Sequence, residues 1–202
     1  MNKKLDVRYL TELALLVAII LVMKLTGLSS IPVGPLNMTL TMVPIAIGAM
    51  LMGPLAGGIL GMIYGFTSFY DAVSGGSVMT GVFFQLSPVH TFLLCVGMRI
   101  LVGVAAGSIF RGLRKVDPTK TVCYFLTGLF TPVLNTILFM GYIVAVFYRS
   151  DFIQEKVAAL NAPNPFMFVI LMVGIQGLVE AVTGAVIGGG VGKGVAHALK
   201  RD

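Results

Sequence analysis

The most informative side chains in this sequence are four polar ones that lie inside apolar stretches: Arg99, Asn135, Gln176 and Glu180. On insertion scales, an Arg or Asp at the centre of a membrane helix costs roughly 2.5–3.5 kcal/mol, so such a group usually faces a partner or a cavity. The four residues come from three different apolar stretches of one small protein. This arrangement predicts a binding site inside a membrane-embedded bundle.

Helical geometry places three of these residues at similar depth. With a rise of about 1.5 Å per residue, Arg99, Asn135 and Glu180 are expected within about 5 Å of one another along the membrane normal. Two interpretations follow. Arg99 and Glu180 form a buried ion pair that fixes helix register, or they form the floor of an outward-opening ligand pocket together with Asn135 and Gln176. The two interpretations are compatible.

Spacing along the helices adds neighbours to this set. Phe139 and Tyr142 are predicted to share the face of Asn135, and Gln176 shares a face with Glu180 by i, i+4 spacing. Four further polar residues are expected near the outer mouth of the bundle, where a lid over the pocket would use them: Asn37, Gln85, His90 and Asn164.

No cofactor is expected from the remaining motifs. The two histidines, His90 and His197, are far apart in the sequence and do not supply the several convergent ligands of a metal site. The run 188–194 resembles a phosphate loop, but the Walker pattern needs Gly at the position of Ile187 and Ser or Thr at that of Gly194. We therefore expect neither a metal nor ATP to bind to this chain.

The composition predicts an all-α integral membrane protein with a single domain. Of the 202 residues, 57% are hydrophobic and only 11% are charged, whereas a soluble domain carries about 25% charged residues. The formal net charge of +6 gathers in short loops and near the ends, which argues against nucleic acid as a partner. Both cysteines lie in apolar segments, so no disulfide framework is expected.

Six membrane-spanning helices are predicted in one compact bundle, over residues 9–28, 38–52, 55–69, 88–110, 122–148 and 166–191. The second and third are shorter than the roughly 20 residues that cross a bilayer, so they are short helices or a re-entrant hairpin. Residues 71–87 and 149–164 are predicted to be external loops. The first span is expected to be retained, because no small-residue cleavage site follows it.

The distribution of positive charge predicts the orientation. Of 14 Lys and Arg residues, ten lie on the side of both termini, three on the other side, and Arg99 lies within the apolar interior. The positive-inside rule therefore places both termini in the cytoplasm. We expect a multi-pass protein of a bacterial-type plasma membrane.

Glycines recur at four-residue intervals in three places: residues 53–65, 103–107 and 184–192. On a helix, this spacing clears a stripe of side chains and lets another backbone approach closely, which we expect to serve packing within the chain. The sequence shows no internal repeat of the kind found in secondary transporters. A stand-alone secondary carrier remains an alternative that this absence disfavours. An intramembrane enzyme is disfavoured because no nucleophile–base pair is evident.

Four short motifs occur in order along the chain: Ala-Leu-Leu-Val-Ala at 14–18, Pro-Ile-Ala-Ile-Gly at 44–48, Gly-Phe-Thr-Ser-Phe at 65–69 and Arg-Ile-Leu-Val-Gly at 99–103. Together with the six-span plan, they resemble the substrate-binding S component of energy-coupling factor (ECF) vitamin transporters. The resemblance covers nearly the whole chain. It implies a substrate-binding subunit of an ABC-type importer and not an enzyme.

The resemblance also implies partners and a cargo. In that family, the helix-one alanines, here Ala14 and Ala18, pack against a transmembrane coupling subunit, which carries two cytoplasmic ATPase subunits. The cargo is a water-soluble vitamin or precursor, bound in an outward pocket under the first, third and fifth loops.

The pantothenate branch is most similar in residues 65–69, in Ser87-Pro88 and in residues 99–103. A buried Arg99 suits a carboxylate. Riboflavin is the alternative cargo, with Phe69, Phe139 and Tyr142 stacked on its ring.

Overall fold

The structure, a computed structural model, describes residues 7–29, 31–33 and 36–200, without the side chains of residues 31–33 and 36–38. Its regular secondary structure is helical apart from one short antiparallel hairpin. In chain order the elements are α1 (Val7–Leu25), β1 (Ile31–Val33), β2 (Leu36–Met38), α2 (Met42–Met52), α3 (Pro54–Ser74), α4 (Val78–Leu86), α5 (Pro88–Phe92), the π-helical segment η1 (Leu93–Gly97), α6 (Met98–Val116), α7 (Val122–Phe147), α8 (Asp151–Ala159), α9 (Pro165–Thr183), the π-helical segment η2 (Gly184–Gly189) and α10 (Gly190–Ala198).

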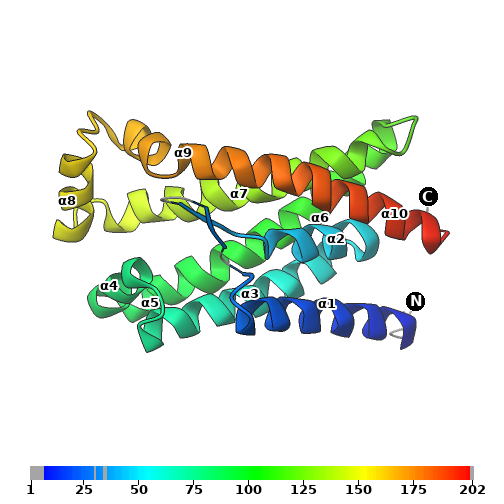
Figure 1. Cartoon of the computed structure of the whole chain (residues 1–202), viewed down its shortest axis with the longest axis horizontal. Helices are drawn as coiled ribbons and strands as arrows, with labels where there is room; N and C mark the ends of the chain where they lie inside the picture. The colour runs from blue at the N-terminus through cyan, green and yellow to red at the C-terminus, as the bar shows by residue number, and fades with distance from the viewer. Residues whose placement is uncertain (1–6, 30, 34–35, 201–202) are drawn as a thin grey trace.

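The described helices include three continuous segments long and apolar enough to cross a membrane: Pro88–Val116, Val122–Phe147 and Pro165–Ala198. The first of these runs through α5, η1 and α6, and the last runs through α9, η2 and α10. The long helices lie roughly along one direction, and α1 begins at the end of the bundle where α10 ends (Figure 1). The prediction of an apolar helical bundle is confirmed.

Several element boundaries differ from the prediction. The segment predicted over residues 55–69 is a 21-residue helix, α3, which continues to Ser74 and ends where Gly75 adopts a left-handed backbone with φ of 80°. The helix in the second predicted span, α2, has 11 residues and is short for a membrane span. Its first turn starts at Met42, because residues 36–38 belong to the hairpin.

Both predicted external loops contain a helix. Residues 71–87 hold the end of α3 and all of α4, which buries Thr80 and Phe83. Residues 149–164 hold α8, which buries Ile153. In each case, one or two side chains packed into the bundle stabilise a short helix. The polar residues that flank it predict a loop instead.

Glycines allow close contact between the helices that carry the predicted site. A Cβ at Gly57 of α3 would lie 2.3 Å from the carbonyl oxygen of Gly103 in α6, and a Cβ at Gly61 would lie 2.2 Å from that of Arg99. At the other contact, a Cβ at Gly128 of α7 would lie 2.3 Å from the carbonyl oxygen of Gly184. The predicted role of the glycine stripes in packing within the chain is confirmed at these contacts.

The loop between α6 and α7 is ordered by one carboxylate. The hydroxyl of Thr119 donates to Asp117 Oδ1 at 2.7 Å, and the Cys123 N–H donates to Oδ2 at 2.8 Å. These bonds lower the pKa of Asp117 to about 2, and the bond from the Thr119 side chain has the largest effect. The carboxylate thus satisfies an N–H group in the first turn of α7, the helix that carries Asn135.

Replacement of Gly57 by Ala is expected to destabilise the bundle. The new Cβ would clash with the Gly103 backbone, which cannot rotate away as a side chain would, so the two helices must separate. We expect a loss of about 1–3 kcal/mol, measured as a lower Tm of the detergent-purified protein.

Gly141→Ala is the matched control, since a Cβ there meets no atom within 4 Å. Alanine is favoured over glycine in a helix by roughly 0.5–1 kcal/mol, so this variant should keep or raise the Tm. Equal Tm values for the two variants would contradict the close packing of α3 and α6.

Candidate functional site

A polar cavity of about 190 Å³ lies among α3, α6, α7 and α9. Five of the predicted site residues line it: Arg99, Asn135, Phe139, Gln176 and Glu180. These residues are brought together by the close packing of α3 on α6 and by the contact of α7 with α9.

Arg99 is the central charge of this cavity. Its side chain is buried, with 6% of the residue surface exposed. The guanidinium lies over the rings of Tyr64 and Phe139, with Cζ 4.5 Å and 4.9 Å from the ring centroids. Such cation–π contacts stabilise a desolvated cation by about 2 kcal/mol or more. The rings hold the guanidinium in place without neutralising its charge.

The π-helical segment before Arg99 contributes to its position. The N–H of Met98 bonds to the carbonyl of Leu93, five residues earlier. Within this segment the carbonyl of Cys95 accepts a hydrogen bond of 3.0 Å from Arg99 Nη1. π-Helical turns are frequent at functional sites, and this one supplies a backbone acceptor for a buried side chain.

Arg99 keeps unused binding capacity. Its Nε is buried without a hydrogen-bond partner among the described residues. Among the described residues, no ion pair joins Arg99 to Glu180 within 4.0 Å. The interpretation of Arg99 and Glu180 as a buried ion pair is therefore wrong for this structure. A buried guanidinium with a free N–H is suited to a carboxylate ligand.

Glu180 is held by other groups. Its Oε1 accepts a 2.9 Å bond from the backbone N–H of Thr39, next to β2, and a 3.0 Å bond from Gln176 Nε2. The residue is 5% exposed. These bonds connect the hairpin segment to α9 and explain why a carboxylate is tolerated in the interior.

Asn135 lines the same cavity from α7 and is half-buried. Its side chain makes no hydrogen bond to the described residues, so its amide remains available to a ligand.

Of the other predicted residues whose side chains are described, none lines this cavity. His90 Nδ1 and the Tyr142 hydroxyl are 2.9 Å apart and bond to each other. Asn164 caps α9, where its Oδ1 accepts a 2.7 Å bond from the Met167 N–H. Gln85 is exposed on α4. Asn37 lies in β2, and its side chain is outside the described part of the chain.

A second polar cavity, of about 560 Å³, adjoins the first and shares with it Thr39, Tyr64 and Met79. Lys24 and Asp71 line it and form an ion pair between α1 and α3. The sequence analysis missed these residues. A signal was present, since Tyr64, Ser68 and Asp71 lie on one face of α3 at i, i+4, i+7 spacing, and all three line this outer cavity.

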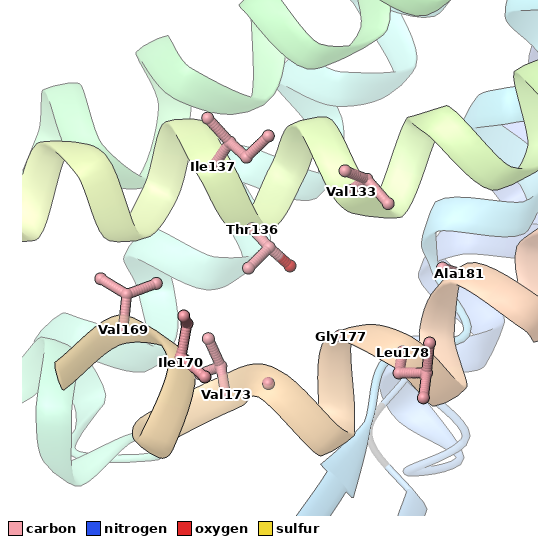
Figure 2. A pocket seen from close by; sticks show the side chains of 10 residues that line it. Val133, Thr136, Ile137, Val169, Ile170, Val173, Gly177, Leu178 and Ala181 are labelled. Carbon is pink, nitrogen blue, oxygen red and sulfur yellow. The ribbon is translucent and has the colours of Figure 1, made fainter. Parts of the chain in front are cut away.

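A separate groove between α7 and α9 has a different chemistry (Figure 2). It encloses about 300 Å³ and is lined by aliphatic side chains such as Val133, Ile137 and Ile170, with the hydroxyl of Thr136 as its polar side-chain group. Because no charged side chain lines it, this groove does not suit a water-soluble ligand, and the polar cavity is the candidate site.

The predicted partner-binding residues lie at the surface of the bundle. Ala14 and Ala18 are exposed on α1, together with neighbours such as Leu15 and Ile19. Their i, i+4 spacing gives α1 a small-residue strip that the other described elements leave uncovered.

A family model described as "ECF transporter, substrate-specific component" matches residues 8–188. No curated protein matches the chain.

The geometry predicts that Asn164 serves α9 and not a ligand. Asn164→Ala removes an N-cap and should cost about 1 kcal/mol of stability, seen as a lower Tm, with ligand affinity retained. Asn164→Asp keeps an oxygen acceptor for the Met167 N–H and is the control that should preserve the Tm. If Asn164→Ala lost ligand affinity without losing stability, the prediction would be contradicted and Asn164 would be a ligand-binding residue.

Proposed function

Because the chain belongs to the family of ECF transporter substrate-specific components, we propose that it binds a water-soluble vitamin, with pantothenate as the best candidate. Membership makes it a membrane-embedded, substrate-binding subunit of an importer and not an enzyme. The observation that carries the choice of cargo is the buried Arg99, which lines a polar cavity with its Nε unpartnered.

A carboxylate is the ligand group that this arginine suits best. A buried guanidinium without a counter-ion carries a large desolvation cost, and an anionic ligand offsets it through charge-assisted hydrogen bonds. Pantothenate has one carboxylate, one amide and two hydroxyl groups. Asn135 and Gln176 line the cavity beside Arg99 and supply amide groups for the remaining polar atoms.

The shape of the site supports an elongated cargo. The deep cavity continues into the outer one through Thr39, Tyr64 and Met79, which line both. A chain-like molecule with its carboxylate on Arg99 can extend from the deep cavity into the polar outer cavity, where Lys24, Asp71 and serine side chains offer further hydrogen bonds.

The aromatic residues favour pantothenate over riboflavin. The Arg99 guanidinium lies over the Phe139 ring, and the Tyr142 hydroxyl bonds to His90 outside the cavity. Phe69 packs edge-on against Phe84 and Phe92. The three rings proposed to stack on a flavin are therefore not arranged around one cavity.

We further propose that the chain crosses the cell membrane six times, with both termini in the cytoplasm. In support, α1 begins and α10 ends at the same end of the bundle (Figure 1). The Lys193 ammonium donates to the Lys120 carbonyl at 3.1 Å, so the loop before α7 lies beside α10. The positive residues of these elements thus gather at one end, as the positive-inside rule requires of the cytoplasmic side.

The family also implies an energy-coupling module as partner. We propose that this module consists of a transmembrane coupling subunit and two cytoplasmic ATPase subunits, and that Ala14 and Ala18 form the contact on α1. Small residues allow two helices to approach closely, and both alanines are exposed for such a contact.

The cargo proposal is tested by thermal unfolding of the detergent-purified protein with pantothenate and with pantothenol, in which an alcohol replaces the carboxylate. At a hundredfold excess over Kd, pantothenate should stabilise the protein by about 2.7 kcal/mol. Pantothenol should bind about a hundredfold more weakly, because it leaves the Arg99 charge unpaired.

Arg99→Met should remove this discrimination, so that both compounds bind with similar weak affinity. Asn135→Ala is the comparison variant, and it should weaken both compounds while preserving the preference for pantothenate. Equal binding of the two compounds to the wild-type protein would contradict the role of Arg99 as the carboxylate-binding residue.

The partner proposal is tested with Ala14→Trp. An indole on the exposed small-residue strip should prevent close approach of a coupling-subunit helix, and co-purification with the energy-coupling module should be lost while pantothenate binding is retained. Ile175→Trp, on the exposed surface of α9, is the control and should leave the complex intact. Normal complex formation by Ala14→Trp would remove α1 from the interface.

A further inference from the structure

The hydrogen bonds of Glu180 fix the orientation of the Gln176 amide. A carboxylate oxygen accepts hydrogen bonds and does not donate them. Glu180 Oε1 lies 3.0 Å from Gln176 and also accepts the Thr39 N–H at 2.9 Å. The NH₂ group of Gln176 must therefore face Glu180. Its carbonyl oxygen, Oε1, is the atom left for a ligand, and it accepts no hydrogen bond from the described residues.

The cavity consequently has two chemically opposite sides. On α6, Arg99 offers only donors, with Nη1 used by the Cys95 carbonyl and Nε unused. On α9, Gln176 offers an acceptor, because its NH₂ group is used by Glu180. We call Gln176 Oε1 the accepting side. Both sides line the same cavity, and no ion pair within 4.0 Å connects them among the described residues.

We propose that the accepting side is a specificity determinant: it binds an O–H or N–H donor of the cargo while the cargo carboxylate lies on Arg99. The cargo class is thus a dipolar molecule, anionic at one end and donating hydrogen bonds at the other. This inference rests on the proposed function. It adds that Gln176 binds a hydrogen-bond donor of the cargo and does not bind an acceptor. Glu180 is the positioning residue that keeps the Gln176 amide in this orientation.

A cycle of variants and ligand analogues tests this assignment. The probes are pantothenate and three analogues that each lack one donor: the two deoxy compounds and the compound with an N-methylated amide. Gln176→Leu and one of the three analogues should each weaken binding about tenfold. Their combination should weaken binding no further than either change alone, because both remove the same hydrogen bond.

Glu180→Gln provides a second, nearly isosteric variant. Its amide oxygen can still accept from Thr39, but the Gln176 amide is free to turn once its partner is also an amide. The preference of the wild-type protein for pantothenate over the donor-lacking analogue should fall about tenfold. A merely structural role of Glu180 would lower stability and leave this ratio unchanged. Ile175→Ala, on the exposed side of α9, should change neither quantity.

The outcomes separate this inference from the choice of cargo. Suppose that pantothenate binds and that, for all three analogues, the loss of affinity multiplies with that caused by Gln176→Leu. This result would overturn the accepting side alone. Binding of biotin in place of pantothenate would overturn the cargo and support the inference, since biotin also joins a carboxylate to N–H donors. Binding only of vitamins without a carboxylate, or of none, would overturn both.

Discussion

The uncompensated charge of Arg99 is the constraint on which the rest of the site depends. A guanidinium in the interior of an apolar bundle needs contacts that stabilise it. If it is also to bind an anionic ligand, those contacts must not neutralise its charge. Two aromatic faces and one backbone carbonyl perform this role here, and the glycine contact of Gly61 with the Arg99 backbone fixes the helix that carries it. None of these contacts carries a negative charge, so the attraction for an anion is retained.

The second feature of the site is that its two buried charges do not neutralise each other. Glu180 uses one oxygen to bond Thr39 and Gln176, which keeps it on α9 and away from Arg99. Had the two side chains formed an ion pair, the cavity would present little field to a ligand. Their separation yields a polarised cavity, with hydrogen-bond donors on one side and an acceptor on the other.

Much of this site could be predicted from the sequence, because a polar residue inside a membrane helix usually faces the bundle interior, a partner or a cavity. The convergence of Arg99, Asn135, Gln176 and Glu180 follows from apolar context and helical spacing. Thr39 was not predictable, since it contributes a backbone N–H that any residue but proline carries. Met79 is hidden in the sequence, because the polar flanks of α4 predict a loop there. The cap at Asn164 has a sequence signal, since an Asn directly before a Pro is a common start of a helix.

The ion pair interpretation failed for a related reason. Sequence spacing gives the depth of a residue but not the partners that compete for it, and two neutral groups with good geometry hold Glu180. The spacing of aromatic residues likewise gives no partners: Phe139 lies under a guanidinium, Phe69 packs edge-on against two other rings, and the Tyr142 hydroxyl bonds to a histidine.

The weak attachment of α1 has a consequence for assembly. Of its 19 residues only Ile20 is buried, while Ala14 and Ala18 face outward. A helix that packs on that strip displaces lipid chains and breaks no contact within the bundle. The free energy of such an assembly is therefore a difference between helix–helix and helix–lipid packing, and the bundle gives up none of its own stability when a partner binds or leaves.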